Sequence, residues 1–360
     1  MSHGFMIRPD DGGPIIDISD SSRVLSSLGR YKVKGASSPG NSTFVNVGIT
    51  SMTTGGTAVV IPTKSCEFYE LSNPPSIDIL RGATVSGSTM RVNFYQENGY
   101  GSSANYIADM NVFEIPAANS GLPAYGIAMY NSVNFLAITD VSRFGYVTYR
   151  GTINVNGTWT IPTSVPNRET CVVFARFNST GTPLWHDRDT NQLRTYTGFG
   201  GNSGAGVGGS ISNIQIVIVS TGFVPPNPSS GYGIVIKNAS GVNTYSSKYP
   251  PVIWRGGYFP FPFYLENSTG GAGKVQWIGS TGNVSQPMVP LGSYGFQCGD
   301  YETGGEYPQK IAHYSGLLMS GNSVSTYRCK PAGGSVYFYT SPVRAQMGFN
   351  LPCLDAADYF

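Results

Sequence analysis

The sequence predicts an all-β protein made of three tandem antiparallel β-sandwich domains, and two observations support this prediction. Charged residues make up only 12% of the 360-residue chain, whereas glycine and small polar residues are abundant, which is typical of short strands and turns. One pattern also occurs three times, starting at Gly4, Gly126 and Gly233, and this spacing fits ordinary domain lengths. The expected domains are 1–120, 121–228 and 229–360.

Each repeat is expected to begin with a β-hairpin. Its first strand is almost continuously apolar, as suits a strand covered on both faces. A turn follows, made of residue types that accept left-handed backbone geometry or bond to their own main chain. The first strands are Phe5-Met6-Ile7, Ile127-Ala128-Met129 and Ile234-Val235-Ile236. The turns are Asp11-Gly12-Gly13, Asn131-Ser132 and Asn238-Ala239-Ser240-Gly241.

Short motifs that recur further along each unit indicate that the three units arose by duplication. An apolar or aromatic residue, a basic residue and glycine recur in every unit, and Ile-Pro-Thr followed by cysteine recurs in the first two. Each unit closes on a strand, and proline-containing small polar segments are expected to link the units. The triplets are Val33-Lys34-Gly35, Tyr149-Arg150-Gly151 and Trp254-Arg255-Gly256. The Ile-Pro-Thr copies are 61–63 and 161–163, the closing strands 110–115, 213–219 and 335–340, and the linkers 116–124 and 224–231.

The composition argues against several classes of partner. A formal charge of +2 and the lack of a dense Lys/Arg cluster disfavour nucleic-acid binding. No apolar run reaches the ~18–20 residues that cross a bilayer, so no membrane insertion is expected. The N-terminus lacks the pattern of a cleaved export signal. No cofactor is expected.

The five cysteines are Cys66, Cys171, Cys298, Cys329 and Cys353. Their odd number and wide spacing, in a chain made in a reducing cytoplasm, predict small buried apolar residues. A Cys298–Cys329 or a Cys329–Cys353 bridge is left open.

The sequence offers little that points to catalysis or to a metal. His186, Asp187 and Asp189 lie together in "WHDRD" (185–189), where they would bind a cation or, in the favoured interpretation, form a polar hairpin tip with an Asp–Arg pair. "GGNSGAG" (200–206) lacks the last glycine of a nucleophile elbow. We therefore expect a non-enzymatic protein with no catalytic or metal residues. A glycan-cleaving enzyme with two distant carboxylates is the minority alternative.

Two segments are candidates for contact with a receptor or partner. The glycine-rich stretch 198–210 is either a flexible surface loop or a loop whose bare backbone lies against a partner. The aromatic segment 254–265 either fills the core and an interface or presents ring faces to a sugar or a protein. The candidate contact residues are Phe199, Asn202, Trp254, Tyr258, Phe259, Phe261, Phe263 and Tyr264.

The first thirty residues resemble a signature of tail proteins of long-tailed bacteriophages. The signature combines an apolar strand after glycine, an Asp-Gly turn, an apolar-Asp-apolar-Ser-Asp run, and an Arg-apolar pair before a glycine. Its positions here are Gly4 to Ile7, Asp11-Gly12, Ile16 to Asp20, Arg23-Val24 and Gly29. The weaker copies in the other two units replace Asp17 by Thr139 and Ser246.

The resemblance implies a virion protein of the tail tip or a short tail fibre, synthesised in the host cytoplasm. Such proteins commonly form trimers, bind other tail proteins and contact a host surface glycan or protein. The resemblance would place the N-terminal domain at the tail and the divergent third domain toward the receptor. A purely architectural protein that joins the tail to separate fibres is the main alternative.

Overall fold

The computed structural model describes residues 4–7, 16–19, 23–36, 42–69, 76–96, 106–116, 126–128, 137–139, 144–198, 206–228, 233–266, 276–301, 309–337 and 344–360. Within these ranges the fold is all-β, and every pair of named strands runs antiparallel. One short 3-10 helix, η1 (Ala356–Asp358), is the sole helical element of the described residues. The predicted all-β class is confirmed.

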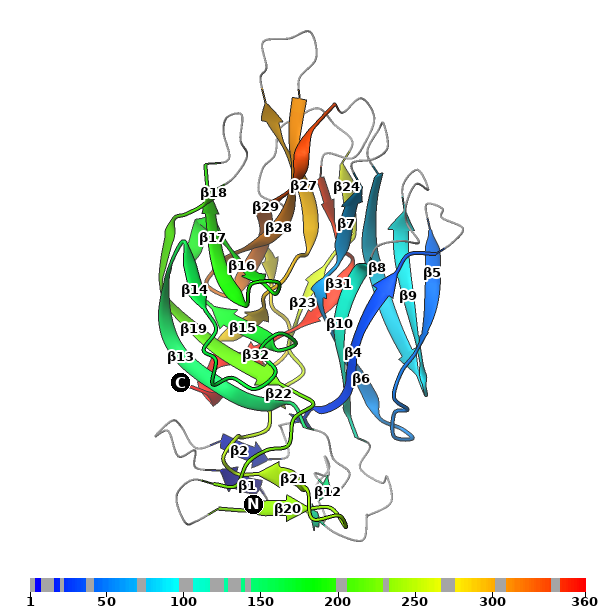
Figure 1. Cartoon of the computed structure of the whole chain (residues 1–360), viewed down its shortest axis with the longest axis vertical. Coiled ribbons are helices and arrows are strands. Elements are labelled where there is room, and N and C mark those ends of the chain that lie inside the picture. The colour runs from blue at the N-terminus through cyan, green and yellow to red at the C-terminus, as the bar shows by residue number, and fades with distance from the viewer. Residues whose placement is uncertain are drawn as a thin grey trace.

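Each repeat begins with an antiparallel pair of strands, as predicted, while the expected turns 11–13 and 131–132 lie outside the described residues. Phe5 lies opposite Ile18 and Ile127 lies opposite Ile138, while Ile236 of the third hairpin lies opposite Tyr245. Strands from all three hairpins gather at the end of the molecule that carries the N-terminus, which we call the base (Figure 1). The strands are β1 (Gly4–Ile7), β2 (Ile16–Ser19), β11 (Gly126–Ala128), β12 (Ala137–Thr139), β20 (Val235–Lys237) and β21 (Asn243–Ser246).

A four-stranded sheet in the order β5-β9-β8-β7 forms one outer layer of the body. Alternation along its strands determines which face is buried, because successive side chains point to opposite faces. Met90, Val92 and Phe94 of β9 are fully buried, whereas Arg91 between them faces solvent. The strands are β5 (Thr43–Gly48), β7 (Cys66–Tyr69), β8 (Ser76–Ser86) and β9 (Thr89–Gln96).

A three-stranded sheet in the order β4-β10-β6 forms the middle layer. Its central strand is buried along almost its whole length because both faces are covered. Met110 and Val112 pack in the core shared with the four-stranded sheet, and Phe113 packs in a second core with Val172 and Val217. The strands are β4 (Ser26–Lys34), β6 (Thr57–Lys64) and β10 (Tyr106–Ile115).

The largest sheet has 15 strands and covers the other side of the middle layer. The main path is β24 (Tyr264–Glu266), β30 (Arg344–Gln346), β27 (Gly295–Tyr301), β28 (Gln309–Ser320), β16 (Ser179–Asp187), β17 (Gln192–Thr197), β14 (Thr158–Thr160), β13 (Tyr146–Asn156), β19 (Ser210–Ser220), β15 (Val172–Arg176), β26 (Pro287–Pro290) and β32 (Leu354–Asp355). Three strands pair off this path, β18 (Gly206–Val207), β25 (Ile278–Gly279) and β29 (Ser323–Tyr337).

Strand pairing connects all three sequence repeats. β16 of the second repeat pairs with β28 of the third, and β15 pairs with β26. The first and third repeats are joined where β3 (Arg23–Val24) pairs with β22 (Ile253–Trp254). The repeats therefore share sheets across 121 and 229, and the division into three tandem sandwich domains stays a prediction.

Part of the aromatic segment and the expected closing strands lie in regular strands. Pro260 lies in β23 (Tyr258–Phe261), which pairs with β31 (Phe349–Pro352) and, through one bridge at Tyr258, with Thr281. The expected closing strands 110–115 and 213–219 fall within β10 and β19. The third, 335–340, coincides with the end of β29 as far as residue 337, and its last residues lie outside the described part.

The cysteines behave as small buried residues wherever the structure describes their side chains. Cys66, Cys171, Cys329 and Cys353 are buried and unbridged, which confirms the prediction and excludes a Cys329–Cys353 disulfide here. The side chain of Cys298 lies outside the described set. No helix among the described residues is long and apolar enough to cross a membrane.

Candidate functional site

The aromatic segment is in part a core element. Phe259 and Phe261 are 0% and 3% exposed and belong to the main core, where the Phe261 ring lies 6.1 Å from the ring of Tyr294. Alternation along β23 explains their burial, since residues two apart face the same side. Burial thus removes Phe259 from the predicted contact surface and leaves Phe261 only a 3% exposed edge at the groove that Trp254 and Tyr258 also line. Phe199 and Asn202, the candidates of the glycine-rich stretch, lie outside the described residues.

The other four aromatic candidates are partly buried. Trp254 donates its indole N–H to the carbonyl of Gly257 at 2.8 Å, and Tyr264 donates to Glu266 at 3.0 Å. The Phe263 ring packs beneath the guanidinium of Arg81, at 4.6 Å. Trp254 and Tyr258 line an open groove of about 870 Å³ between β6, β8 and β31. These four residues stay candidate contacts.

A second pocket, of about 430 Å³, is lined by charged and aromatic side chains. It lies between the middle sheet and the "WHDRD" segment, which spans the end of β16 and the start of the turn to β17. The lining residues that the site depends on are Arg30, Lys32, Tyr106, Asp109, His186 and Arg188. We call this cavity the Asp109 pocket.

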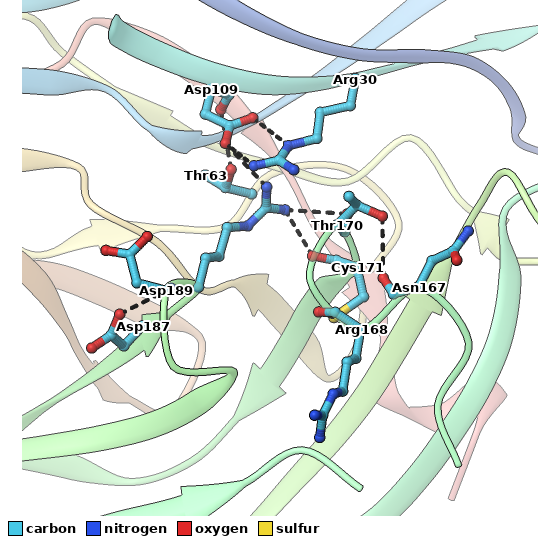
Figure 2. A network of polar contacts seen from close by, with 10 residues as sticks. Arg30, Thr63, Asp109, Asn167, Arg168, Thr170, Cys171, Asp187 and Asp189 are labelled. Atoms are coloured by element: carbon cyan, nitrogen blue, oxygen red, sulfur yellow. Dashed lines mark hydrogen bonds and ion pairs between the residues drawn. The ribbon is translucent and has the colours of Figure 1, made fainter. Parts of the chain in front are cut away.

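Asp109 holds two guanidinium groups at the wall of this pocket (Figure 2). Arg30 donates through Nε to Asp109 Oδ1 at 2.7 Å and through a second nitrogen to Oδ2. Arg188 donates to the same Oδ2 at 3.3 Å. Burial by itself would raise the pKa of Asp109, but Arg30 and Arg188 outweigh it and hold that pKa below its usual value. The carboxylate is therefore ionised at neutral pH.

Backbone carbonyls fix the position of Arg188. It donates to the carbonyls of Cys171 at 2.7 Å and Thr170 at 3.5 Å, two residues of the network shown in Figure 2. Asp187, at the end of β16, pairs with Arg194 at 3.0 Å and accepts from the amide of Asp189 at 3.2 Å. The predicted hairpin tip is confirmed, but each charge of the tip pairs outside "WHDRD", as Arg188 does with Asp109.

Several buried polar atoms at this wall make no hydrogen bond within the described residues. Within the described part of the chain, neither ring nitrogen of His186 makes a hydrogen bond, and nor do Nε1 of Trp185 and Nε of Arg188. Burial, followed by the charges of Arg188 and Arg30, lowers the pKa of His186 to about 3. The His186 ring is therefore neutral at physiological pH. Buried polar atoms without partners lower the stability of the fold, and apolar side chains in their place would not have this cost.

The mouth of the pocket carries the accessible groups. Tyr106 is 45% exposed, and the ammonium groups of Lys32 and Lys34 lie 5.8 and 5.2 Å from the centre of its ring. Lys64 pairs with Glu67. This arrangement combines a ring face with cationic donors, so it suits a polar ligand that has both an apolar face and acceptor oxygens.

Sequence reasoning singled out "WHDRD" but missed the rest of the pocket. The missed residues are spread over 30–32, 63–67, 106–109, 293, 314 and 330. The repeated Ile-Pro-Thr signature was the nearest signal, because Thr63 of the first copy lines the pocket and the cysteine that follows the second copy contacts Arg188. Thr63 donates to the carbonyl of Asp109 at 3.1 Å, and Cys171, which follows the second copy, accepts from Arg188.

Among the described residues, no group of three or more His, Cys, Asp or Glu side chains is placed to hold a metal ion. A family model described as "Family of unknown function (DUF6453)" matches residues 4–339. No curated protein and no solved structure matches the chain.

Proposed function

The chain belongs to the DUF6453 family of unknown function, and we propose that it is a structural component of a bacteriophage tail tip or short tail fibre. In this role it would contribute to host-cell attachment by non-covalent binding of a surface glycan or protein. The support comes from the resemblance of residues 4–29 to tail proteins of long-tailed phages, and from the all-β architecture. The protein would be made in the host cytoplasm and carried in the virion tail.

The Asp109 pocket is the observation that carries the attachment role. Ligand sites are concave, with ring and apolar walls and a few fixed polar groups that orient the ligand. The pocket has a volume of about 430 Å³, an exposed tyrosine at its mouth and arginines held by Asp109 behind it. Weak contacts of this kind hold a particle when they are multiplied by display on an oligomer, for which we favour a trimer.

In this role the base would dock on other tail proteins. Val24, in β3 just before the middle sheet, packs with Ile236 and Tyr245 of the third base hairpin. Lys34, at the pocket mouth, is the last residue of β4 and lies ten positions further along the chain. A base docked on other tail proteins would therefore leave the pocket free to meet the cell surface. Because all three repeats contribute lining residues, contact would extend beyond the segment 229–360.

The test is binding of the purified, fluorescently labelled protein to intact candidate host cells. Tyr106→Ala removes the ring at the pocket mouth, which is 45% exposed. The control Phe44→Ala removes a ring of β5 that is 46% exposed and lies under the guanidinium of Arg91, away from the pocket. We expect saturable binding that is lost with Tyr106→Ala and kept with Phe44→Ala. Folded protein that binds no permissive cell would refute the attachment role.

A purely architectural tail protein is the second candidate, and the burial of Phe259 and Phe261 favours it. If the aromatic segment serves packing, then the groove beside Trp254 and Tyr258 would accept another tail protein instead of a receptor. Binding to purified tail proteins but to no cell would support this function. Release of soluble sugar from host envelope by the purified protein would instead indicate a glycan-cleaving enzyme, whereas our proposal expects none.

A further inference from the structure

We infer that the Asp109 pocket binds an acidic sugar, with the carboxylate or phosphate of the sugar at Lys32 and the sugar ring on Tyr106. The inference names the ligand class of the proposed site, and it rests on the proposed attachment function for where such a polysaccharide is met. Three observations support it: the excess of positive charge around Asp109, the exposure of Lys32, which forms no ion pair within the described residues, and the tyrosine ring at the pocket mouth.

More positive charge surrounds Asp109 than this carboxylate can neutralise. Arg30 and Arg188 both pair with it, and Lys32 lies directly opposite it in the register of β4 and β10. One carboxylate therefore faces three cations. The other acids of the pocket are already paired, since Glu67 meets Lys64, Asp187 meets Arg194 and Asp189 meets Lys330 at 3.8 Å. A local excess of positive charge attracts an anion.

The position of this charge makes it effective. The side chains of Arg188 and Asp109 are 12% and 9% exposed, so solvent screens their field less than it would at an open surface. Asp109 also holds both guanidinium groups in place, which lowers the cost of ordering them when a ligand arrives. The field is therefore preformed, and an incoming anion meets fixed positive charge behind the mouth.

Lys32 is a lining cation that an incoming anion can reach, and Lys34 lies beside it over the same ring. Its side chain is exposed, and within the described residues it forms no ion pair and lies over the Tyr106 ring. A lysine ammonium has three donors. The Lys32 ammonium can therefore donate to the carboxylate or phosphate of a ligand while Asp109 keeps the two arginines fixed.

The rings favour a sugar over a small inorganic anion. Tyr106 presents an exposed ring next to Lys32, and the rings of Trp185 and Tyr314 pack 6.1 Å apart in the pocket wall. A bare phosphate would make no use of such faces. A volume of about 430 Å³ lies within the range of small-molecule sites, about 300–1,000 Å³. The pocket therefore has room for a sugar unit as well as its acidic group.

The experiment is titration calorimetry of the full chain with four probes at low salt. The probes are a polyuronate, a phosphorylated glucan, an uncharged glucan of matched length, and inorganic phosphate. We expect binding of at least one charged polymer, at least tenfold tighter than binding of the uncharged glucan and of inorganic phosphate. The polymer that binds identifies the acidic group as carboxylate or phosphate. Equal binding of the uncharged glucan would overturn the inference, and equal binding of inorganic phosphate would overturn its sugar part.

Two lysine variants locate the binding. Lys32→Ala should weaken binding at least tenfold, whereas Lys248→Ala, which removes a lysine 5.9 Å from the Tyr249 ring centre, should leave it unchanged. Lys32→Arg should restore most of the affinity, because the charge is kept. Unchanged affinity in a folded Lys32→Ala protein, checked by near-ultraviolet circular dichroism, would refute the assignment.

The same proteins separate this inference from the proposed function. Cell binding that survives Lys32→Ala, with no polymer bound, would leave attachment standing and refute the acidic-sugar site. Polymer binding that needs Lys32, with no attachment to any permissive cell, would confirm the site and refute the attachment role.

Discussion

The aromatic segment 254–265 and the Asp109 pocket differ in how their residues are distributed along the chain. The segment is dense in sequence, yet its rings at Phe259 and Phe261 are buried in the main core. The pocket is sparse in sequence, because its central contact joins Asp109 to Arg30 and to Arg188, each 79 residues away. The dense run of aromatic residues in the sequence therefore indicated core packing. The charged groups of the pocket, in contrast, come together only because the fold brings separate strands side by side. The predictions below test this contrast in decreasing order of effect.

The largest effect is expected from Phe259→Ala. The ring is fully buried, so its removal should lower the free energy of unfolding by about 3–5 kcal/mol, through lost burial and a residual cavity. Denaturation in urea measures the change. Tyr258→Ala, at a partly exposed neighbour, should cost clearly less. Equal losses in the two variants would break the contrast between core and rim in this segment.

An intermediate effect is expected from Asp109→Asn. It leaves Arg30 and Arg188 without a counter-charge, which should cost about 2–3 kcal/mol in a site that remains partly open to water. Asp189→Asn is the control, because that carboxylate is 90% exposed and should give no measurable change. A loss at Asp109 no larger than at Asp189 would contradict a preorganised pocket.

The pH dependence of the Asp109→Asn effect follows from the pKa of the carboxyl group. Because the folded pKa of Asp109 is below that of the unfolded chain, about 3.9, the stabilisation is complete above that value. It is lost as the pH falls through the lower folded pKa. The wild type and Asp109→Asn should therefore converge in stability in strongly acidic solution. Urea titrations from pH 7 down to pH 2 measure this convergence, and a constant difference would contradict it.

The smallest effect is expected from His186→Leu. Neither ring nitrogen of His186 has a partner among the described residues, so an apolar side chain of similar size should raise stability by about 1 kcal/mol. His186→Ala supplies the comparison, because it leaves a cavity. A loss of stability with leucine would indicate that the ring is needed where it stands, and would sharpen the case for a polar wall shaped by function.

Local chemistry predicted the local structure. The repeated apolar run predicted the three antiparallel strand pairs, and the number and spacing of the cysteines predicted buried thiols. These features depend on neighbours within a few residues, where turn chemistry and side-chain periodicity decide the outcome.

The pairing of strands from different repeats could not be predicted in this way. Whether β16 pairs with β28 depends on edges that meet only in the folded chain. The pocket could not be predicted for the same reason, since Asp109 meets Arg30 and Arg188 only in the folded chain. Its function as a holder of Arg30 and Arg188 follows from the register of the sheet and from the turn after β16.

The pairing of β3 with β22 has a consequence for the time course of folding. Val24 lies opposite Ile253, which is 229 positions later in the chain, and both belong to the small core at the base. A ribosome that adds ~5–20 residues per second needs on the order of ten seconds or more to cover that distance. During that interval β3 lacks its partner strand. Contacts so distant in sequence also slow folding itself, so we expect the base to be the last part of a newly made chain to become protected from hydrogen exchange.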